Sequence, residues 1–130
     1  MARKPAKVLT DLELDIMRLL WQREEATVED LATAFAQRGR ILAEPSFRTM
    51  LSILRKKGYA TRRRAGRGFL YRATVPSAEV EKNILRDLID RVFDGSAAGL
   101  VAALVQQGIV GEKHLAKARK LIAKREKGEE

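Results

Sequence analysis

The chain has 130 residues, enough for one ordinary domain or two small ones, and 45% of them are hydrophobic, as in most globular proteins. It has no cysteine, which excludes disulfides and thiolate metal sites, and no apolar run approaches the roughly 18 residues that a membrane-spanning helix needs. The basic N-terminus lacks the apolar segment of a secretory signal, so we expect a soluble, cytoplasmic protein.

The net charge of +9 is unevenly placed. Residues 1–76 hold 16 Lys/Arg against 8 Asp/Glu, whereas residues 77–130 hold 10 against 9. Within residues 38–72, 11 basic residues accompany a single acid, Glu44. Basic residues that merely solvate a surface are usually interspersed with acids, as they are in the second half of the chain. A segregated positive field attracts a polyanion, so the first half predicts a nucleic-acid partner.

The N-terminal part predicts a basic arm and two capped helices. Residues 1–9 are too few to fold alone. Thr10 and Glu13 form a capping box for a helix that ends near Trp21, which we interpret as a core or domain-junction residue. Thr27 caps a second helix, Val28–Gln37. The residues expected to face the core are Leu12, Ile16, Leu19 and Leu20 in the first helix and Leu31, Ala32, Phe35 and Ala36 in the second.

A third helix follows a short break and runs from Pro45 to Lys57. Pro45 suits the first turn because its missing N–H is not needed there, and Gly58 suits the end because it adopts the left-handed conformation. Its apolar side consists of Phe47, Met50, Leu51 and Leu54, and its polar, basic side of Ser46, Arg48, Thr49, Ser52 and Lys56. Two helices joined by a short break, the second of them basic, form the helix-turn-helix pattern.

A basic hairpin follows this helix directly. Strand-like runs at Tyr59–Arg64 and Phe69–Arg72 flank Ala65–Gly68, whose two glycines supply the positive φ of a tight turn. The hairpin makes the predicted fold a winged helix. We expect Arg48, Thr49 and Ser52 to read base edges in the major groove. Lys56 and the hairpin arginines, which are Arg62, Arg63, Arg64 and Arg67, are expected to hold phosphates.

The best domain boundary lies at Val75-Pro76-Ser77, where Pro76 ends the last strand and Ser77 is expected to cap the next helix. We therefore predict a winged-helix DNA-binding domain, 1–76, and a helical domain, 77–130. The second domain contains three helices, over residues 78–93, 97–107 and 112–127. They offer more apolar surface than they can bury on one another, which favours dimerisation over packing against the first domain. The expected dimer contacts are Ile84, Leu85, Leu88, Ile89, Val92, Phe93, Leu100, Val101, Leu104 and Val105.

Several motifs in this order resemble the penicillinase repressors, the BlaI/MecI family. They are Leu9 to Trp21 (LTDLELDIMRLLW), Arg48 to Gly58 (RTMLSILRKKG), Gly66 to Tyr71 (GRGFLY) and Asp90 to Ser96 (DRVFDGS). The resemblance implies a mainly α fold with a small β-hairpin wing, in which an N-terminal winged helix-turn-helix precedes a C-terminal three-helix dimerisation domain. It also implies a homodimeric bacterial repressor of transcription, connected with antibiotic resistance, that binds palindromic operators in double-stranded DNA. Its recognition helix would contact DNA through Ser46, Arg48, Thr49 and Ser52.

The resemblance also suggests how such a repressor releases DNA. In staphylococcal members a membrane sensor triggers cleavage at an Asn–Phe bond in the penultimate helix, and Ala103-Leu104 stands at the corresponding place here. The copper-responsive branch uses C-terminal cysteine pairs, which this chain lacks. A regulatory protease or an unknown ligand remains open as the trigger. Ile53 stands where many members carry a basic residue, and Pro45 shifts the helix start, so operator preference is expected to differ.

The sequence gives little support to an enzyme. His114, the one histidine, lies beside lysines in an amphipathic helix, where a solvated surface position is expected. Asp87, Asp90 and Asp94 share a helix face, but nearby arginines favour ion pairs over a metal site. We expect no cofactor and no metal. Two other functions stay open, a winged-helix adaptor that binds protein and a protein that binds structured RNA. The adaptor would lack a coherent basic face, and the A-form major groove is too narrow to be read.

Overall fold

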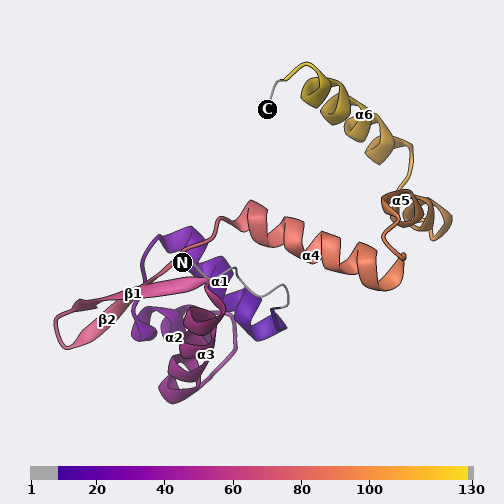
Figure 1. The fold of residues 1–130 in the computed structure, drawn as a ribbon. Helices are drawn as coiled ribbons and strands as arrows, with labels where there is room; N and C mark the ends of the chain where they lie inside the picture. Colours follow the sequence, from indigo (N-terminus) through magenta and orange to yellow (C-terminus); the bar gives the residue numbers. More distant parts are fainter. Residues whose placement is uncertain (1–8, 129–130) are drawn as a thin grey trace. The chain divides into compact units, whose positions relative to one another are not determined.

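The computed structural model describes residues 9–128, so the expected basic arm, residues 1–8 of it, and the last two residues lie outside the described part. In this part the elements are α1 (Asp11–Arg23), α2 (Val28–Gln37), α3 (Glu44–Lys57), β1 (Ala60–Ala65), β2 (Gly68–Ala73), α4 (Ser77–Val92), α5 (Ala97–Gln106) and α6 (Glu112–Glu126). Helices dominate and the two strands form one antiparallel hairpin (Figure 1), which confirms the predicted fold class. The chain divides into two compact units, residues 1–87 and 88–130.

Both predicted N-terminal caps are present. The Thr10 hydroxyl oxygen accepts from the Glu13 N–H at 3.2 Å, and a Glu13 carboxylate oxygen accepts from the Thr10 N–H at 2.8 Å. Thr27 and Asp30 make the same reciprocal pair at the start of α2. Each pair satisfies two backbone donors that the first helical turn leaves without a partner. Ser77, by contrast, is the first residue of α4 and not the residue before it.

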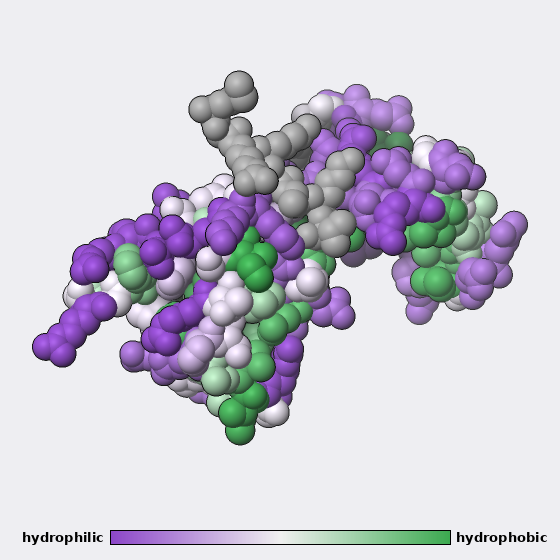
Figure 2. Space-filling model, turned by 60° about the horizontal axis from the view of Figure 1, so that its bottom comes forward, coloured by the Kyte–Doolittle hydropathy of each residue, from purple (hydrophilic) through white to green (hydrophobic). Residues whose placement is uncertain are grey.

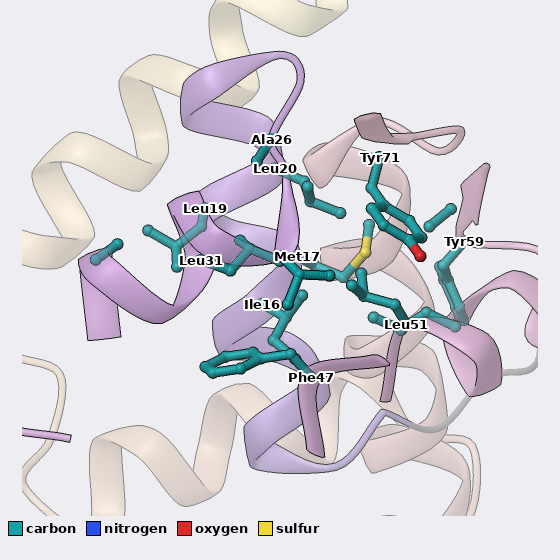
Figure 3. Packing of buried hydrophobic residues seen from close by; sticks show 14 of the residues in the cluster. Ile16, Met17, Leu19, Leu20, Ala26, Leu31, Phe47, Leu51, Tyr59 and Tyr71 are labelled. Carbon is teal, nitrogen blue, oxygen red and sulfur yellow. The ribbon is translucent and has the colours of Figure 1, made fainter. Parts of the chain in front are cut away.

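The core of the first unit is built from all three N-terminal helices and the hairpin. Figure 3 shows Ile16 and Met17 of α1 between Phe47 on one side and Tyr71 on the other. The rings of Phe35 and Phe47 meet edge to face, with centroids 4.9 Å apart, and so join α2 to α3. Burying each such side chain contributes about 1.5–3 kcal/mol. The packing thus fixes α3 on its apolar side and leaves its other side open.

Two details of the core differ from the sequence pattern. In α2 the buried residues are Val28, Leu31, Ala34 and Phe35, whereas Ala36, expected inside, is exposed. The buried residues of α2 are spaced three to four positions apart, so the last buried pair is Ala34 and Phe35. The expected pair, Phe35 and Ala36, is one residue closer to the C-terminus. Three other residues expected inside are only half-buried, and they are Leu12 of α1, Ala32 of α2 and Met50 of α3.

The start of α4 belongs to the first unit. Val80 is 1% exposed and forms part of the core. Trp21 donates its indole N–H to the Val75 carbonyl at 2.8 Å, which ties α1 to the segment leading into α4. The tryptophan is half-buried there, at the end of the winged-helix part of the chain.

The second unit contains the end of α4, α5 and α6, and no residue of α5 or α6 is buried. The Ser96 hydroxyl accepts from the Gly99 N–H at 2.9 Å and caps α5. His114 is exposed, as expected, and its Nδ1 accepts from the Gly111 N–H at 3.0 Å, so it also caps α6. Between residues 9 and 128, no helix combines the length and the apolar character that crossing a membrane requires.

Candidate nucleic-acid interface

Local sequence and long-range packing together position α3. Pro45 lies in its first turn, and Gly58 ends it at φ 89°, a left-handed conformation that few residues other than glycine adopt readily. Arg55, Lys56 and Lys57 occupy the last turn, where cations oppose the negative end of the helix dipole. Phe47, Leu51 and Leu54 are fully buried, so the helix cannot rotate about its axis without exposing them.

A partly buried ion pair fixes the C-terminal end of α3 against α1. The Lys57 ammonium lies 2.9 Å from both carboxylate oxygens of Glu13, and Glu13 is only 1% exposed. Burial alone raises the pKa of the Glu13 carboxyl, but the Thr10 backbone hydrogen bond and the Lys57 ammonium outweigh it and hold the pKa below its usual 4.5. Glu13 therefore caps α1 and anchors α3 with one charged group.

The outer side of α3 carries the residues predicted to contact DNA. Ser46, Arg48, Thr49 and Lys56 are exposed, and Ser52 is half-buried. An Arg48 terminal nitrogen lies 3.2 Å from a Glu44 carboxylate oxygen. Water screens this exposed ion pair, so a phosphate or a base can replace Glu44 as the partner of Arg48. The Thr49 hydroxyl donates to the Pro45 carbonyl at 3.0 Å, and the residue as a whole is exposed.

One further basic residue lies on this side. Arg55 is exposed and stands seven residues, or about two helical turns, after Arg48. Sequence reasoning omitted it, although its spacing from Arg48 and Ser52 gives the signal. The exposed basic side of α3 therefore extends along most of the helix.

The hairpin of β1 and β2, residues 60–73, is called the wing below. Arg62 pairs with Tyr71, Arg63 with Leu70 and Arg64 with Phe69, and Ala65 and Gly68 close the ladder. Gly66, at φ 61°, and Arg67 make the two-residue turn. In Figure 2 the wing is largely hydrophilic on the side shown. Since neighbouring side chains on a strand point to opposite faces, the three consecutive arginines cannot act as one cluster.

Arg62 and Arg64 lie on the face that carries the aromatic residues. The Arg62 guanidinium is 3.8 Å from the centre of the Phe69 ring, and that of Arg64 is 5.6 Å from it. Stacking on an aromatic ring holds an arginine in place without using its outward N–H donors. These two guanidinium groups are thus held and still able to donate.

Arg63 points to the other face and has a different partner. Its Nε and a terminal nitrogen donate to the two carboxylate oxygens of Glu25 at 2.8 and 3.1 Å. These hydrogen bonds lower the pKa of Glu25. Glu25 precedes Ala26, whose backbone exchanges hydrogen bonds with that of Tyr71. Arg63 therefore reinforces the connection between the wing and the segment joining α1 to α2.

A hollow of about 410 Å³ separates α3 from the wing tip. Arg48 of α3 and Arg67 of the turn both line it, together with Phe69 and Glu29. Arg48 and Arg67, which are 19 positions apart in the chain, thus face one concave space. The described residues contain no group of three or more side chains that could hold a metal ion.

Comparisons with known proteins agree along most of the chain. The family model described as "Penicillinase repressor" matches residues 9–124. The methicillin resistance regulatory protein MecI of Mammaliicoccus sciuri is 20% identical over 117 residues, which cover 90% of this chain and 94% of that protein. An uncharacterized 16.5 kDa protein in the ptsI 3′ region of Latilactobacillus sakei is 26% identical over 114 residues, which cover 88% of this chain and 77% of the relative.

Two solved structures share the fold. The DNA-binding domain of the repressor BlaI covers 59% of this chain and 93% of its own, with a TM-score of 0.51 and 22% identity. The YusO protein from Bacillus subtilis covers 93% of this chain and 77% of its own, with a TM-score of 0.55 and 15% identity. At these identities the likeness concerns the arrangement of the elements only.

Proposed function

The chain belongs to the penicillinase repressor family, a family of transcriptional repressors and not of enzymes, and we propose that it binds a palindromic operator in double-stranded DNA as a homodimer in the cytoplasm. The observation that carries this proposal is the exposed basic side of α3, held by a buried apolar side and followed by a basic wing. A helix of this kind fits the major groove of B-DNA, where each base pair presents its own pattern of donors and acceptors.

We assign base reading to the middle of α3. Arg48 is long enough to donate to two acceptors on a guanine edge, and the Thr49 methyl group suits contact with a thymine methyl. Ser46 and Ser52 flank them and suit contacts with base edges or phosphates. Lys56 and Arg55 near the end of α3 suit phosphates, because a base edge lies deeper in the groove than a flanking phosphate.

We assign phosphate contact in the wing to Arg62, Arg64 and Arg67. Arg67 lies at the exposed turn, and the other two are held on Phe69 with donors to spare. Arg63, which the sequence placed with them, donates to Glu25. Its contribution to DNA binding is proposed to be indirect, through the position of the wing, unless DNA displaces Glu25.

Exposed apolar surface in α4 and α5 supports the homodimer. Val92 is 62% exposed, Val101 53% and Leu85 51%, and Ile84, Leu88 and Val105 are also exposed. Large side chains of this kind rarely remain in water over such a length of a folded chain. A second copy would cover them, together with the half-buried Ile89, Phe93, Leu100 and Leu104. Two identical readers related by a two-fold axis then impose a palindrome on the operator.

The first unit has an apolar hollow of its own. A hollow of about 590 Å³ is lined by Leu14 and Trp21 of α1 and by Val80, Ile84 and Leu85 of α4. We propose that the second copy also contacts this hollow. The second copy would then contact α1, whose Glu13 forms the ion pair with Lys57 of α3.

Release of DNA is proposed to follow from weakening of the dimer. Cleavage within α5, or a ligand that alters the C-terminal helices, would separate the two readers without touching α3. Linked binding of two half-sites exceeds the affinity of one by about 10² or more, so its loss is sufficient for induction. Ala103-Leu104 lies inside α5, where a cut would divide the helix.

The choice of nucleic acid is tested by comparing duplex DNA, duplex RNA and single strands of one length at one salt concentration. Preference for duplex DNA is the expected result. Preference for duplex RNA would favour the RNA-binding alternative, and binding to none of the three would favour a protein adaptor.

A further inference from the structure

Four lysines of α6 and Lys127, the residue directly after it, form a regular stripe. Lys113, Lys117, Lys120, Lys124 and Lys127 are spaced by four, three, four and three residues, and all five are exposed. At 3.6 residues per turn this spacing places them on one side of the helix. At 1.5 Å per residue, the stripe is about 21 Å long.

The opposite side of α6 is apolar and is partly covered within the second unit. Leu115 and Ala118 are half-buried there, and Ile122 continues the same side. The helix has no aromatic residue. A helix that lies in a membrane surface needs a free apolar side, commonly with Trp or Phe, and half of this side is covered. The open surface of α6 therefore includes the lysine stripe, and Leu121 and Ile122, which are 59% and 56% exposed, add a short apolar part near its C-terminal end.

The stripe is not neutralised by neighbouring acids. The acids of α6 are Glu112 and Glu126, at its two ends, against six basic residues. Within residues 9–128, the ion pairs of the structure involve no lysine of the stripe. By contrast, α4 mixes both signs and α5 carries no charge. Five evenly spaced ammonium groups with no interspersed acid attract a regular polyanion more than a protein surface, since protein interfaces are depleted in lysine.

We propose that the lysine stripe of α6 is a second contact to the DNA backbone, independent of base sequence and separate from α3 and the wing. A DNA strand presents one phosphate per 3.4 Å of helix axis, so a stripe of this length spans several phosphates. The contact adds affinity without changing the preferred sequence. The inference rests on the proposed function, because it presupposes that the protein binds duplex DNA.

The test uses the full-length protein and a random-sequence DNA duplex of about 40 base pairs, long enough to span roughly four helical turns. Binding is measured over a series of salt concentrations for wild type and Lys117→Gln/Lys124→Gln. Arg119→Gln/Arg125→Gln is the matched control, since it removes two positive charges from the same helix but off the stripe. Sedimentation of each protein reports self-association.

The slope of log affinity against log salt should become shallower by about 0.9 for every phosphate that the lysine variant no longer neutralises, and should change little in the control. Equal effects of the two variants would overturn the proposal, because they would reflect net charge alone. A changed self-association in the lysine variant would also overturn it and place the stripe at the protein interface.

Two further arms separate the remaining outcomes. Vesicles of phosphatidylglycerol and phosphatidylcholine test a membrane surface: binding that depends on Lys117 and Lys124, with an unchanged DNA slope, would overturn the DNA assignment. Wild type is expected to bind duplex DNA, and Arg48→Ala is expected to bind the selected operator more weakly. If both results hold but the lysine variant binds DNA as wild type does, the stripe proposal alone is refuted. Absence of any duplex binding by wild type would refute the proposed function as well.

Discussion

Replacing Glu13 by Gln should destabilise the first unit, although the new side chain has the same shape. Glu13 is 1% exposed and faces the Lys57 ammonium at 2.9 Å on both oxygens. Removing one partner of a fully buried ion pair costs about 3–5 kcal/mol. The Lys57 side chain is 28% exposed, so water screens part of the interaction that the substitution removes. We expect a loss of about 2–3 kcal/mol in the free energy of unfolding, below the range for a fully buried pair.

Urea unfolding followed by the fluorescence of Trp21 measures this loss, because Trp21 is the one tryptophan and is bonded to Val75 within the first unit. Protein concentration must be equal in all samples, since dimerisation contributes to stability. Asp15→Asn is the control: it removes the surface ion pairs with Arg18 and Arg40 and should cost less than about 1 kcal/mol. A Glu13→Gln protein as stable as wild type would refute the role given to the pair.

The same variant makes a pH prediction. The folded pKa of Glu13 is depressed below 4.5, so its contribution is complete above that pH and is lost as pH falls through the folded value. The stability difference between wild type and Glu13→Gln should therefore be constant near neutrality and shrink below about pH 4.5. A difference that grew on acidification would contradict the sign of this shift.

Three other predictions concern DNA and the dimer. Arg48→Ala should cost about 1–3 kcal/mol of binding free energy on the operator and little on random DNA. Arg67→Ala should weaken binding to both duplexes and make the slope of log affinity against log salt shallower by about one unit. Titrations with both duplexes measure these effects. Arg63→Ala and Glu25→Ala should weaken DNA binding by similar factors, because each breaks the same pair; a large loss with Arg63→Ala alone would indicate direct phosphate contact. Leu104→Asp should lower both self-association and operator affinity, and a tight dimer on its operator would exclude the C-terminal helices as the switch.

Local chemistry explains why much of the fold could be predicted from the sequence. The Thr10 and Thr27 caps, the glycine at the end of α3 and the two-residue turn of the wing depend on residues within four positions of one another. The buried side of α3 followed from its spacing. The wing arginines were harder, because their roles depend on strand register and on Glu25, 38 residues away from Arg63.

The net charge of a long segment does not show how the charges are distributed within it. Charge summed over residues 77–130 nearly cancels, which hid the lysine stripe of α6 behind the acids of α4 and the C-terminus. Arg55 lies at the edge of the polar side of α3, which is centred on Thr49 and Lys56, so the helical pattern alone does not single it out. The dimer contacts stay a prediction, since a single chain contains only half of such an interface.

The central proposal, that two copies of α3 read one palindromic site, is tested most directly by selecting duplexes from a random library with full-length protein and sequencing them. We predict two inverted half-sites with centres about 10–10.5 base pairs, or a multiple of that, apart. The Arg48→Ala protein should fail to enrich the same motif. Enrichment of a single asymmetric site, or of no sequence at all by a protein that still binds DNA, would contradict the proposal.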